Sequence, residues 1–471
     1  MKMNFAMLKT SFAVTAGKTV AALSGFLKLG SGTSLPGKVA RRLDPALLRH
    51  LGKQVRKQVI AVTGTNGKTT TCGLLAQFLR ESGGQVVHNQ LGANMVPGIT
   101  AALMQQSSFF GHMQADYAVL EVDEGSLRGL TGEIEVQRVV VSNLFRDQLD
   151  RYGELDTTAR MIREGILKTP ILQGHGRLIL NGDDPLVTTL GQDDAFQSAE
   201  HGSITDRILY FGVEQVTYQH AAPVAGPVPF TREVTQCPAC QGPLVYRHLV
   251  FGHLGDYQCG QCGYQRPPLQ VAAEHVLVKP EESQLRLRYG SEIVELTLPL
   301  PGLFNVYNLV AAAAVAYDLG LPTSVLAEGL RHYQSVFGRA EKKIIQGKNA
   351  CIMLIKNPVG ASEVLKLVGG DPQGRLLIAL NDNYADGRDV SWIWDAQFEA
   401  IPAEKSVVVS GVRAEDMATR LKYAGLPESN ITVESDLKAA LQLALSQTQL
   451  DEVLYILPTY TALLSLHKML G

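Results

Sequence analysis

A glycine-rich loop between an apolar strand and a helix restricts the fold of this chain more than any other feature. Residues 58–71 read QVIAVTGTNGKTTT, and residues 72–84 have helical spacing and end in two glycines. Glycines let backbone N–H groups approach phosphate oxygens, and the amino end of a helix adds partial positive charge. Lys68 can reach the outer phosphates, and Thr69 or Thr70 can offer a hydroxyl to Mg²⁺. The loop therefore predicts a nucleotide site on an α/β sheet.

Short apolar strands alternate with helical segments along most of the chain, which indicates an open parallel sheet. Residues 212–270 are rich in Pro, Gly and Cys and are interpreted as an insertion, and residues 282–300 predict antiparallel strands. After Gly338 the alternation resumes, which predicts a second α/β domain. Parallel strands are predicted at residues 116–122, 139–144, 177–180, 350–355, 376–381, 406–409 and 453–456.

A chain of 471 residues is too long for one compact core. We expect a helical extension over residues 1–56, a central nucleotide-binding domain over 57–337 and an α/β domain over 338–471. The net charge of −2 gives no reason to expect a nucleic-acid partner. Because Lys18 interrupts the apolar amino-terminal stretch, we expect neither a cleaved signal nor a membrane span, and a cytoplasmic location.

Four of the six cysteines form two CxxC pairs. Two such pairs are typical of a zinc ribbon, in which two turns each present two thiolates to a tetrahedral Zn²⁺. Because no ligand position is left for a substrate, we expect a structural zinc in a ribbon over about residues 234–268. The predicted ligands are Cys237, Cys240, Cys259 and Cys262.

The other cysteines and the histidines of the ribbon are expected to have no chemical role. Cys72 and Cys351 lie in apolar segments and are interpreted as small core residues. His248 and His253 lie between the two CxxC pairs and are expected at the surface.

Six segments follow one another in an order that resembles the Mur ligases and the folylpolyglutamate synthases. The general P-loop pattern fails, because Val62 stands where it requires glycine, but the loop is similar to the one in this family. Taken together, the matches extend from Lys57 to the carboxyl end. The segments are TGTNGKTTT (63–71), AVLEV (118–122), SNLFRDQLDRYGELD (142–156), NGDDP (181–185), PGLFNVYNLVAAAA (301–314) and FGRAE (337–341).

The resemblance implies a Mur ligase-like central ATPase domain that phosphorylates a carboxylate, after which an amine attacks the acyl phosphate. It implies that Glu121 binds Mg²⁺ and that Arg339 faces ATP; such cations would balance the charge of the phosphates. The residues that it assigns to ATP and Mg²⁺ are Gly64, Thr65, Asn66, Gly67, Lys68, Thr69, Thr70, Glu121, Asn181, Asp184, Asn305 and Arg339.

Three departures narrow the resemblance. Gln148 stands where most Mur ligases have a histidine for a second metal ion, so that second metal site is in doubt. The carbamylated lysine of the family has no position that we can assign. Residues 356–364, KNPVGASEV, stand where the family has an acidic motif that helps to bind an incoming amino acid. This loss suggests that the attacking amine is not an amino acid.

A cysteine ribbon inserted in such a core resembles the MurT family, whose members work with a GatD-like class I glutaminase. Further similar segments are LGANM (91–95), NPVGASEV (357–364), NDNYADGRDVSWIWD (381–395) and LPTYTALL (457–464). The resemblance implies amidation of the α-carboxyl of D-glutamate in lipid II to D-isoglutamine, with ammonia supplied by the glutaminase. A lipid-bearing substrate also implies contact with the inner face of the membrane.

In this family picture the chain contributes the acid that completes the glutaminase's Cys–His pair. Asp382 follows a predicted strand, where active-site residues of α/β sheets gather, and Asp386 and Asp389 lie in the next loop. The sequence does not choose among the three.

Two other functions remain open at this point. One is a Mur-type or folylpolyglutamate-type ligase that adds an amino acid, which an intact acidic motif at Lys356 would have favoured. The other is a zinc-ribbon binding protein whose nucleotide site acts as a switch, although the ribbon lacks the basic run of a nucleic-acid binder.

Overall fold

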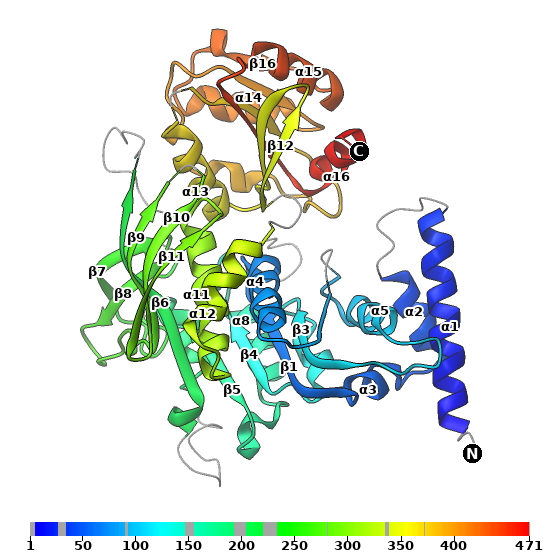
Figure 1. Cartoon of the computed structure of the whole chain (residues 1–471). Helices are drawn as coiled ribbons and strands as arrows, with labels where there is room; N and C mark the ends of the chain where they lie inside the picture. The colour runs from blue at the N-terminus through cyan, green and yellow to red at the C-terminus, as the bar shows by residue number, and fades with distance from the viewer. Residues whose placement is uncertain are drawn as a thin grey trace.

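A computed structural model describes residues 5–26, 34–89, 93–146, 155–192, 204–219, 233–279, 281–334, 339–371 and 373–470. A large sheet with helices on both faces forms its centre, and a second sheet stands beyond it (Figure 1). The amino-terminal helix forms the edge of the molecule farthest from the ribbon (Figure 1). Among the described residues, no helix combines the length and apolar character needed to cross a bilayer.

The first part of the chain builds the central sheet. Its strands are β1 (Val55–Thr63), β2 (Val86–His88), β3 (Ala115–Glu121), β4 (Arg138–Val141), β5 (Arg177–Asn181), β6 (Ile208–Tyr218), β9 (Val271–Val278), β10 (Ser283–Tyr289) and β11 (Glu292–Leu298). The ribbon strands are β7 (Leu244–Phe251) and β8 (Leu254–Cys259). The helices are α1 (Phe5–Phe26), α2 (Leu35–Leu43), α3 (Leu47–Gly52), α4 (Lys68–Glu81), α5 (Val96–Gln106), α6 (Leu127–Thr131), α8 (Leu155–Ile166), α9 (Pro185–Thr189), α11 (Leu303–Asp318) and α12 (Thr323–His332).

The last part of the chain builds the second sheet. Its strands are β12 (Arg339–Ile345), β13 (Lys348–Met353), β14 (Arg375–Ala379), β15 (Val407–Ser410), β16 (Ile431–Val433) and β17 (Val453–Pro458). The helices beside them are α13 (Pro358–Gly369), α14 (Ala414–Tyr423), α15 (Leu437–Gln447) and α16 (Tyr460–Leu470).

The central sheet has the order β11-β10-β9-β6-β5-β4-β1-β3-β2. In this order, each neighbouring pair from β9 to β2 is parallel. The pairs β9–β10 and β10–β11 are antiparallel. The second sheet, β12-β13-β17-β14-β15-β16, is parallel apart from its edge strand β12. The predicted α/β class, with two sheets and antiparallel strands within residues 282–300, is confirmed.

One expectation about the insertion is wrong. Residues 212–218 belong to β6, which pairs with β9 in the central sheet. From Glu214 to Tyr218 the side chains alternate between half-buried and exposed, because the central sheet is covered less completely there. This polar alternation resembles the start of an insertion, although the chain leaves the sheet only after Tyr218.

Alternation along the strands gives the central sheet two apolar layers. Ile60 and Val62 face the layer that contains α4, α11 and α12. Val59 and Ala61 face the layer that contains α5, the amino-terminal helices and the buried side chains of the ribbon near its cysteines. The amino-terminal helices therefore share a core with the nucleotide-binding sheet.

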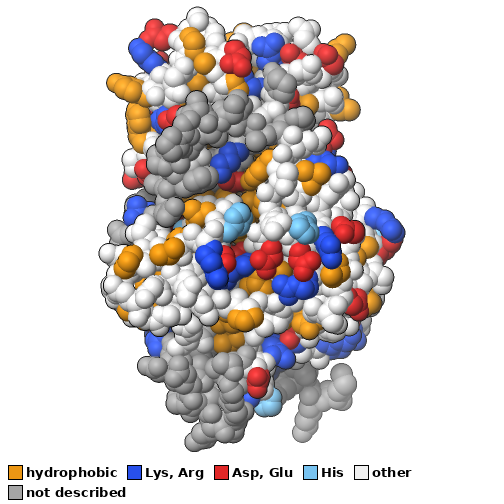
Figure 2. Space-filling view, turned by 90° about the vertical axis from the view of Figure 1, so that its left-hand side faces the viewer, with side chains coloured by type: hydrophobic (Ala, Val, Ile, Leu, Met, Phe, Trp, Pro, Cys, Tyr) orange, Lys and Arg blue, Asp and Glu red, His pale blue; other side chains and the backbone are white. Residues whose placement is uncertain are grey.

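Charged side chains of both signs are interleaved across the outer face of β9, β10 and the ribbon (Figure 2). Glu274 lies 3.4 Å from Arg286 and 3.1 Å from Arg288, and Glu214 lies 3.0 Å from Arg266. Cross-strand pairs of opposite charge stabilise neighbouring strands modestly. These pairs lie on the face from which the ribbon leaves the sheet.

Candidate active site

Two glycines fix the shape of the loop between β1 and α4. Gly64 and Gly67 have φ values of 121° and 89°, a region that residues with a Cβ rarely adopt. A Cβ on Gly64 would lie 2.4 Å from Ser142 Oγ, and one on Gly67 would lie 1.9 Å from Asn308 Oδ1. The loop thus requires glycine at both positions, for backbone conformation and for space.

The side chains at the start of α4 meet a cluster of acidic residues at the end of β3. Lys68 Nζ donates to Gly64 O at 2.5 Å and to Glu124 Oε1 at 2.9 Å. Thr69 Oγ1 donates to Glu121 Oε2 at 2.8 Å, and Glu121 itself is buried. Hydroxyl and carboxylate oxygens therefore converge beside a lysine at a helix amino end, the donor set that a magnesium–phosphate group requires.

The charges in this cluster depend on one another. Burial opposes the charged form of Lys68, but Glu124, Glu121 and Asp123 together raise its pKa above the usual value. Burial raises the pKa of Glu124, which Lys68 partly offsets. Lys68 is therefore a firmly charged group that a nucleotide phosphate could attract away from Glu124.

A second loop, after β4, holds the glycine loop in place. Asn143 accepts from Asn66 N through Oδ1 at 2.9 Å, and its backbone oxygen accepts from Thr65 N at 2.9 Å. Asn181 donates to Ser142 O at 2.8 Å from the end of β5. All these contacts lie at the carboxyl ends of parallel strands, where α/β sheets bind ligands.

Asp184 has an internal structural role in this arrangement. It caps α9 by accepting from Leu186 N and Val187 N, and its other oxygen accepts from Leu144 N at 2.8 Å. Thr70 is buried on the first turn of α4. Asn305 donates to Pro301 O and accepts from Asn308, which in turn packs behind Gly67. The internal hydrogen bonds of Asp184 and Asn305 order the loops around the site.

Asp183, which the sequence did not single out, ties three elements together. It accepts from Arg266 Nε at 2.7 Å, Tyr307 OH at 2.8 Å and Val213 N at 2.8 Å, and it is fully buried. Burial raises its pKa to about 6, although Arg266 opposes the shift. This aspartate joins the ribbon's end, β6 and α11 next to the nucleotide loop.

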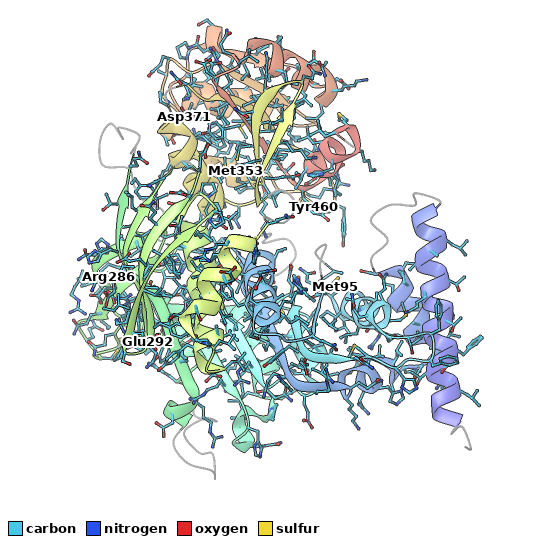
Figure 3. The ribbon with its side chains drawn as sticks, viewed as in Figure 1. Met95, Arg286, Glu292, Met353, Asp371 and Tyr460 are labelled. Carbon is cyan, nitrogen blue, oxygen red and sulfur yellow. The ribbon has the colours of Figure 1, made fainter. Side chains whose placement is uncertain are left out.

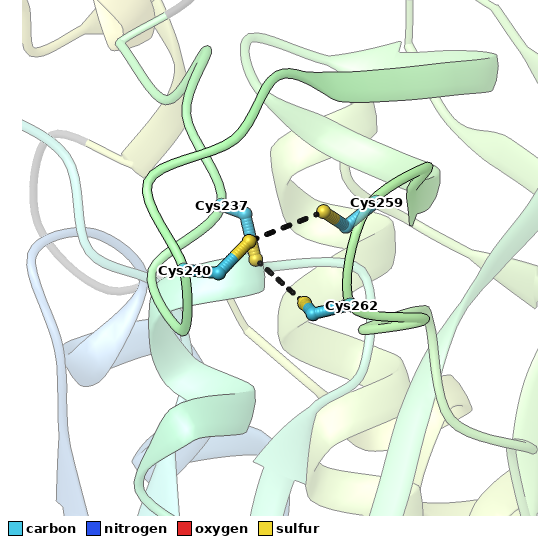
Figure 4. Close-up of side chains that lie close together, drawn as sticks. All are labelled: Cys237, Cys240, Cys259 and Cys262. Atoms are coloured by element: carbon cyan, nitrogen blue, oxygen red, sulfur yellow. Dashed lines mark hydrogen bonds between the residues drawn. The ribbon is translucent and has the colours of Figure 1, made fainter.

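The four predicted zinc ligands converge (Figure 4). Their sulfur atoms all lie within 4.8 Å of one another, with 3.6 Å between Cys237 and Cys262 and 3.5 Å between Cys240 and Cys259. Four thiolates around a tetrahedral zinc with bonds of about 2.3 Å would lie about 3.8 Å apart. The arrangement and the chemistry of the donors therefore fit a zinc ion.

The ribbon packs directly on the helix that Asp184 caps. Thr188 Oγ1 lies 2.6 Å from Tyr257 OH and 2.5 Å from Tyr264 OH. Tyr264 OH also donates to Pro185 O at 2.5 Å. The ribbon is thus a support for α9 and, through Asp184, for the loop after β4.

One prediction about the ribbon is wrong, since His253 is not at the surface. It is fully buried at the turn between β7 and β8, 3.5 Å from Asp184 Oδ1, and its ring packs on Phe145 at 4.7 Å between centroids. His248 is exposed, as expected. The difference arises because the hairpin folds back onto the sheet, which places its tip in the core.

The second sheet contacts the nucleotide loop through the segment that replaces the family's acidic motif. Asn357 caps α13 and donates to Asn66 Oδ1 at 3.0 Å. A pocket between the two parts is lined by Gly67 and Thr70 on one side and by Lys356 and Gly360 on the other. Residues 356–360 thus form one wall beside the glycine loop.

The start of α16 also faces this region. Tyr460, the first residue of α16, lies opposite Met95, the residue just before α5 (Figure 3). Burial, Asp386 and Glu121 raise the pKa of the Tyr460 hydroxyl. The carboxyl-terminal segment LPTYTALL therefore lies within electrostatic range of Glu121.

The three candidate acids differ in their surroundings. Asp382 forms an ion pair with Arg413 at 3.1 Å. Asp386 is buried and accepts from Thr461 N and Thr461 Oγ1 at 2.7 and 2.5 Å; burial raises its pKa. Asp389 is exposed, and a hydrogen bond from Ser391 lowers its pKa. Of these three aspartates, only Asp389 is exposed and forms no ion pair with a cationic side chain among the described residues.

Some predicted positions lie outside the described residues. They include Gln148 and the side chain of Arg339. Glu124 and Asn143 were missed as site residues. A signal for Glu124 was present, because it follows Glu121 in the acidic segment EVDEG after a buried strand.

Cys72 and Cys351 are both buried, as predicted. Burial raises the pKa of both thiols, that of Cys351 to about 12. Neither thiol has the ionisation that a nucleophile needs at neutral pH.

Two protein families match parts of the chain. The Mur ligase middle domain matches residues 62–215, and the MurT ligase C-terminal domain matches residues 354–463. Among solved structures, a pseudomurein peptide ligase type C from Methanothermus fervidus aligns with a TM-score of 0.64 and 24% identity, over 88% of this chain and 79% of that one. A folylpolyglutamate synthase from Mycobacterium tuberculosis aligns with a TM-score of 0.61 and 15% identity, over 90% and 94%. These structures show the same fold.

Curated relatives share much more of the sequence. The lipid II isoglutaminyl synthase (glutamine-hydrolyzing) subunit MurT of Streptococcus pneumoniae is 38% identical over 98% of this chain and 97% of its own length. The subunit of the same name from Staphylococcus aureus (strain COL) is 36% identical over 87% and 86%. With this similarity and both domain matches, the chain belongs to the MurT family of Mur ligase-type proteins.

Proposed function

We propose that this chain is the synthetase subunit of a glutamine-hydrolysing lipid II isoglutaminyl synthase, an ATP-dependent carbon–nitrogen ligase of peptidoglycan synthesis. The observation that carries the proposal is the sequence identity to subunits of that name, 38% over 98% of this chain and 36% over 87% of it. The acceptor is the α-carboxyl of D-glutamate in the stem peptide, and the product is D-isoglutamine. A GatD-like glutaminase supplies ammonia, and the lipid substrate brings the cytoplasmic enzyme to the inner face of the membrane.

The reaction has two steps. The terminal phosphoryl group of ATP passes to a carboxylate oxygen, giving an acyl phosphate and ADP. Ammonia then attacks the acyl carbon, phosphate leaves with the electrons of the broken C–O bond, and the nitrogen loses a proton. The Lys68 side chain and the backbone N–H groups of the first turn of α4 would stabilise the phosphate charge, because the first N–H groups of a helix have no partner within the helix.

Magnesium would supply further neutralisation of charge on the phosphates. Thr69 and Glu121 are the residues proposed to hold it, since their oxygens already meet at 2.8 Å. The internal bonds of Asn181, Asp184 and Asn305 support a role in ordering the loops around ATP. The four cysteines are proposed to hold a structural zinc that takes no part in the reaction.

Replacing Glu121 by glutamine is expected to raise the Mg²⁺ concentration for half-maximal activity by about 10–100-fold, because a neutral amide binds the cation less strongly. The measurement is the rate of ammonium-dependent amidation at increasing Mg²⁺. Glu295→Gln, an exposed glutamate on β11, is the matched control and should leave the curve unchanged. An unaltered Mg²⁺ dependence in Glu121→Gln would remove this residue from the proposed site.

Ammonia fits the site better than an amino acid does. Residues 356–364 replace the acidic motif, and Asn357 caps α13 while contacting the glycine loop. An incoming amino acid would need a partner for its charged groups, whereas ammonia needs none. This feature favours a glutaminase partner over the amino-acid ligase alternative.

Asp389 is proposed as the acid that completes the partner's glutaminase triad. Its exposed carboxylate is free to orient a histidine from another chain, whereas Asp382 pairs with Arg413 and Asp386 caps α16. In the complex with the glutaminase, Asp389→Asn is expected to lower glutamine-dependent amidation by about 10³-fold or more and leave ammonium-dependent amidation unchanged. A product assay run in parallel with glutamine and with ammonium measures both.

Asp382→Asn and Asp386→Asn, which change the other two candidate acids, and Asp395→Asn serve as comparisons in the same region. If Asp382→Asn shows the selective loss and Asp389→Asn does not, Asp382 replaces Asp389 in the proposal. If none of the aspartates affects glutamine use, the shared triad is refuted.

A further inference from the structure

The outer surface of the amino-terminal helix has an unusual composition. A helix on a protein surface normally has a polar face toward solvent. In α1 the inner residues Ala13 and Val14 are fully buried, yet Leu8, Phe12 and Leu23 on the other side are 47%, 65% and 54% exposed. Packing within the chain therefore leaves an apolar stripe uncovered.

A second segment extends this stripe. Phe109 and Phe110, in the loop after α5, are 61% and 69% exposed. Ser11 Oγ donates to Phe110 O at 3.2 Å, and Thr15 Oγ1 donates to Phe109 O at 3.4 Å. These bonds hold the loop beside the turn of α1 that carries Phe12. We call Leu8, Phe12, Leu23, Phe109 and Phe110 the amino-terminal apolar surface.

The amino-terminal segment, which carries α1, is rich in positive charge. Residues 1–58 contain eleven Lys and Arg and a single acidic residue, Asp44, which gives a formal charge of +10 in a chain whose net charge is −2. Asp44 is buried, where it accepts from Thr10 Oγ1 at 2.9 Å. Lys9 on α1 and Lys38 and Arg42 on α2 are exposed. The remainder of the chain therefore has a formal charge of −12, and the excess of basic over acidic residues is confined to this end.

We propose that the amino-terminal apolar surface inserts into the headgroup region of an anionic lipid bilayer. Exposed Phe and Leu with flanking lysines and no exposed acid are the features that bind a helix to such an interface. Cationic side chains near the surface add attraction to anionic headgroups that decreases with salt. The inference extends the proposed use of a lipid substrate, because the chain itself would bind the membrane, independently of that substrate.

The position of the surface agrees with this occupant. The amino-terminal helix α1 lies at an edge of the molecule, away from the carboxyl-terminal part that contains the second sheet (Figure 1). Asp389, the proposed contact with the glutaminase, belongs to that carboxyl-terminal part. The glutaminase could therefore bind while α1 contacts the bilayer. A complementary protein partner would need an acidic apolar surface of its own, whereas an anionic bilayer offers both properties at once.

The test is flotation of the purified full chain, in complex with its glutaminase, with vesicles of phosphatidylglycerol and phosphatidylcholine and no lipid II. The wild type should float with the mixed vesicles, bind pure phosphatidylcholine far less, and dissociate as salt increases. The triple variant Phe12→Ser, Phe109→Ser, Phe110→Ser should lose about tenfold or more of the binding. The matched control, Ile344→Ser, Val412→Ser, Leu450→Ser, removes three exposed apolar side chains of the carboxyl-terminal part and should bind normally.

Other outcomes are decisive against the proposal. Wild-type protein that stays unbound with anionic vesicles, or equal binding by the triple variant, would overturn it. A wild-type dimer of the complex that the triple variant dissociates, without vesicle binding, would show that a second copy covers the surface. Thermal unfolding of each variant confirms that it is folded. Amidation of a soluble lipid II fragment, without the bilayer, separates this question from the proposed function, because the triple variant should retain full activity there.

Discussion

Replacing Lys68 by methionine is expected to lower kcat/KM for ammonium-dependent amidation by about 10³-fold or more, since the change removes the cation closest to the proposed phosphates. The assay follows ADP release and amide formation at saturating ammonium. Lys53→Met, an exposed lysine just before β1, is the matched control and should retain full activity.

The same substitution has a second effect that must be separated from catalysis. Lys68 pairs with buried Glu124 at 2.9 Å, so its removal leaves a buried carboxylate without its cation, at a cost of about 3–5 kcal/mol in stability. The double variant Lys68→Met, Glu124→Gln should recover much of the stability and none of the activity. Recovery of activity in the double variant would contradict the assigned role of Lys68.

The substitution Cys259→Ser is expected to abolish binding of one zinc per chain, because a tetrahedral site with one thiolate missing holds the metal much less tightly. Without the ion, the ribbon over residues 234–268 should become about tenfold more susceptible to limited proteolysis. Metal analysis and a protease time course measure the two effects.

Cys351→Ser provides the control, because this buried thiol lies on β13 in the second sheet. It should retain zinc and an intact ribbon. Because the ribbon supports α9 through Thr188, Cys259→Ser is also expected to weaken ATP binding. Full zinc content in Cys259→Ser would refute the four-cysteine site.

The features of the nucleotide site and of the zinc site that depend on short segments were predictable from sequence. The glycine loop depends on a strand, two glycines with positive φ and a helix start, all within residues 58–71. Paired CxxC spacing predicted the convergence of sulfur atoms because each pair forms its own tight turn. The alternation of strands and helices likewise predicted both sheets.

The burial of single polar residues was not predictable, because it depends on contacts between segments far apart in the chain. His253 is buried only because the ribbon hairpin folds onto Phe145, more than a hundred residues earlier. Burial raises the pKa of Asp183, and the hydrogen bonds from Arg266 and Tyr307 oppose this shift; neither residue is a neighbour of Asp183 in sequence. The assignment of Asn181 and Asp184 to ATP, the place of Arg339 and the domain boundaries after residues 56 and 337 stay predictions.

The most direct test of the proposed function is the mass of the product formed from lipid II, ATP, Mg²⁺ and ammonium chloride by this chain alone. The account predicts that one hydroxyl of the stem peptide becomes an amino group, and that glutamine replaces ammonium only when the glutaminase subunit is added. An unchanged mass, although the chain binds ATP and lipid II, would contradict amide formation by this subunit. Addition of a whole amino acid would establish the amino-acid ligase instead.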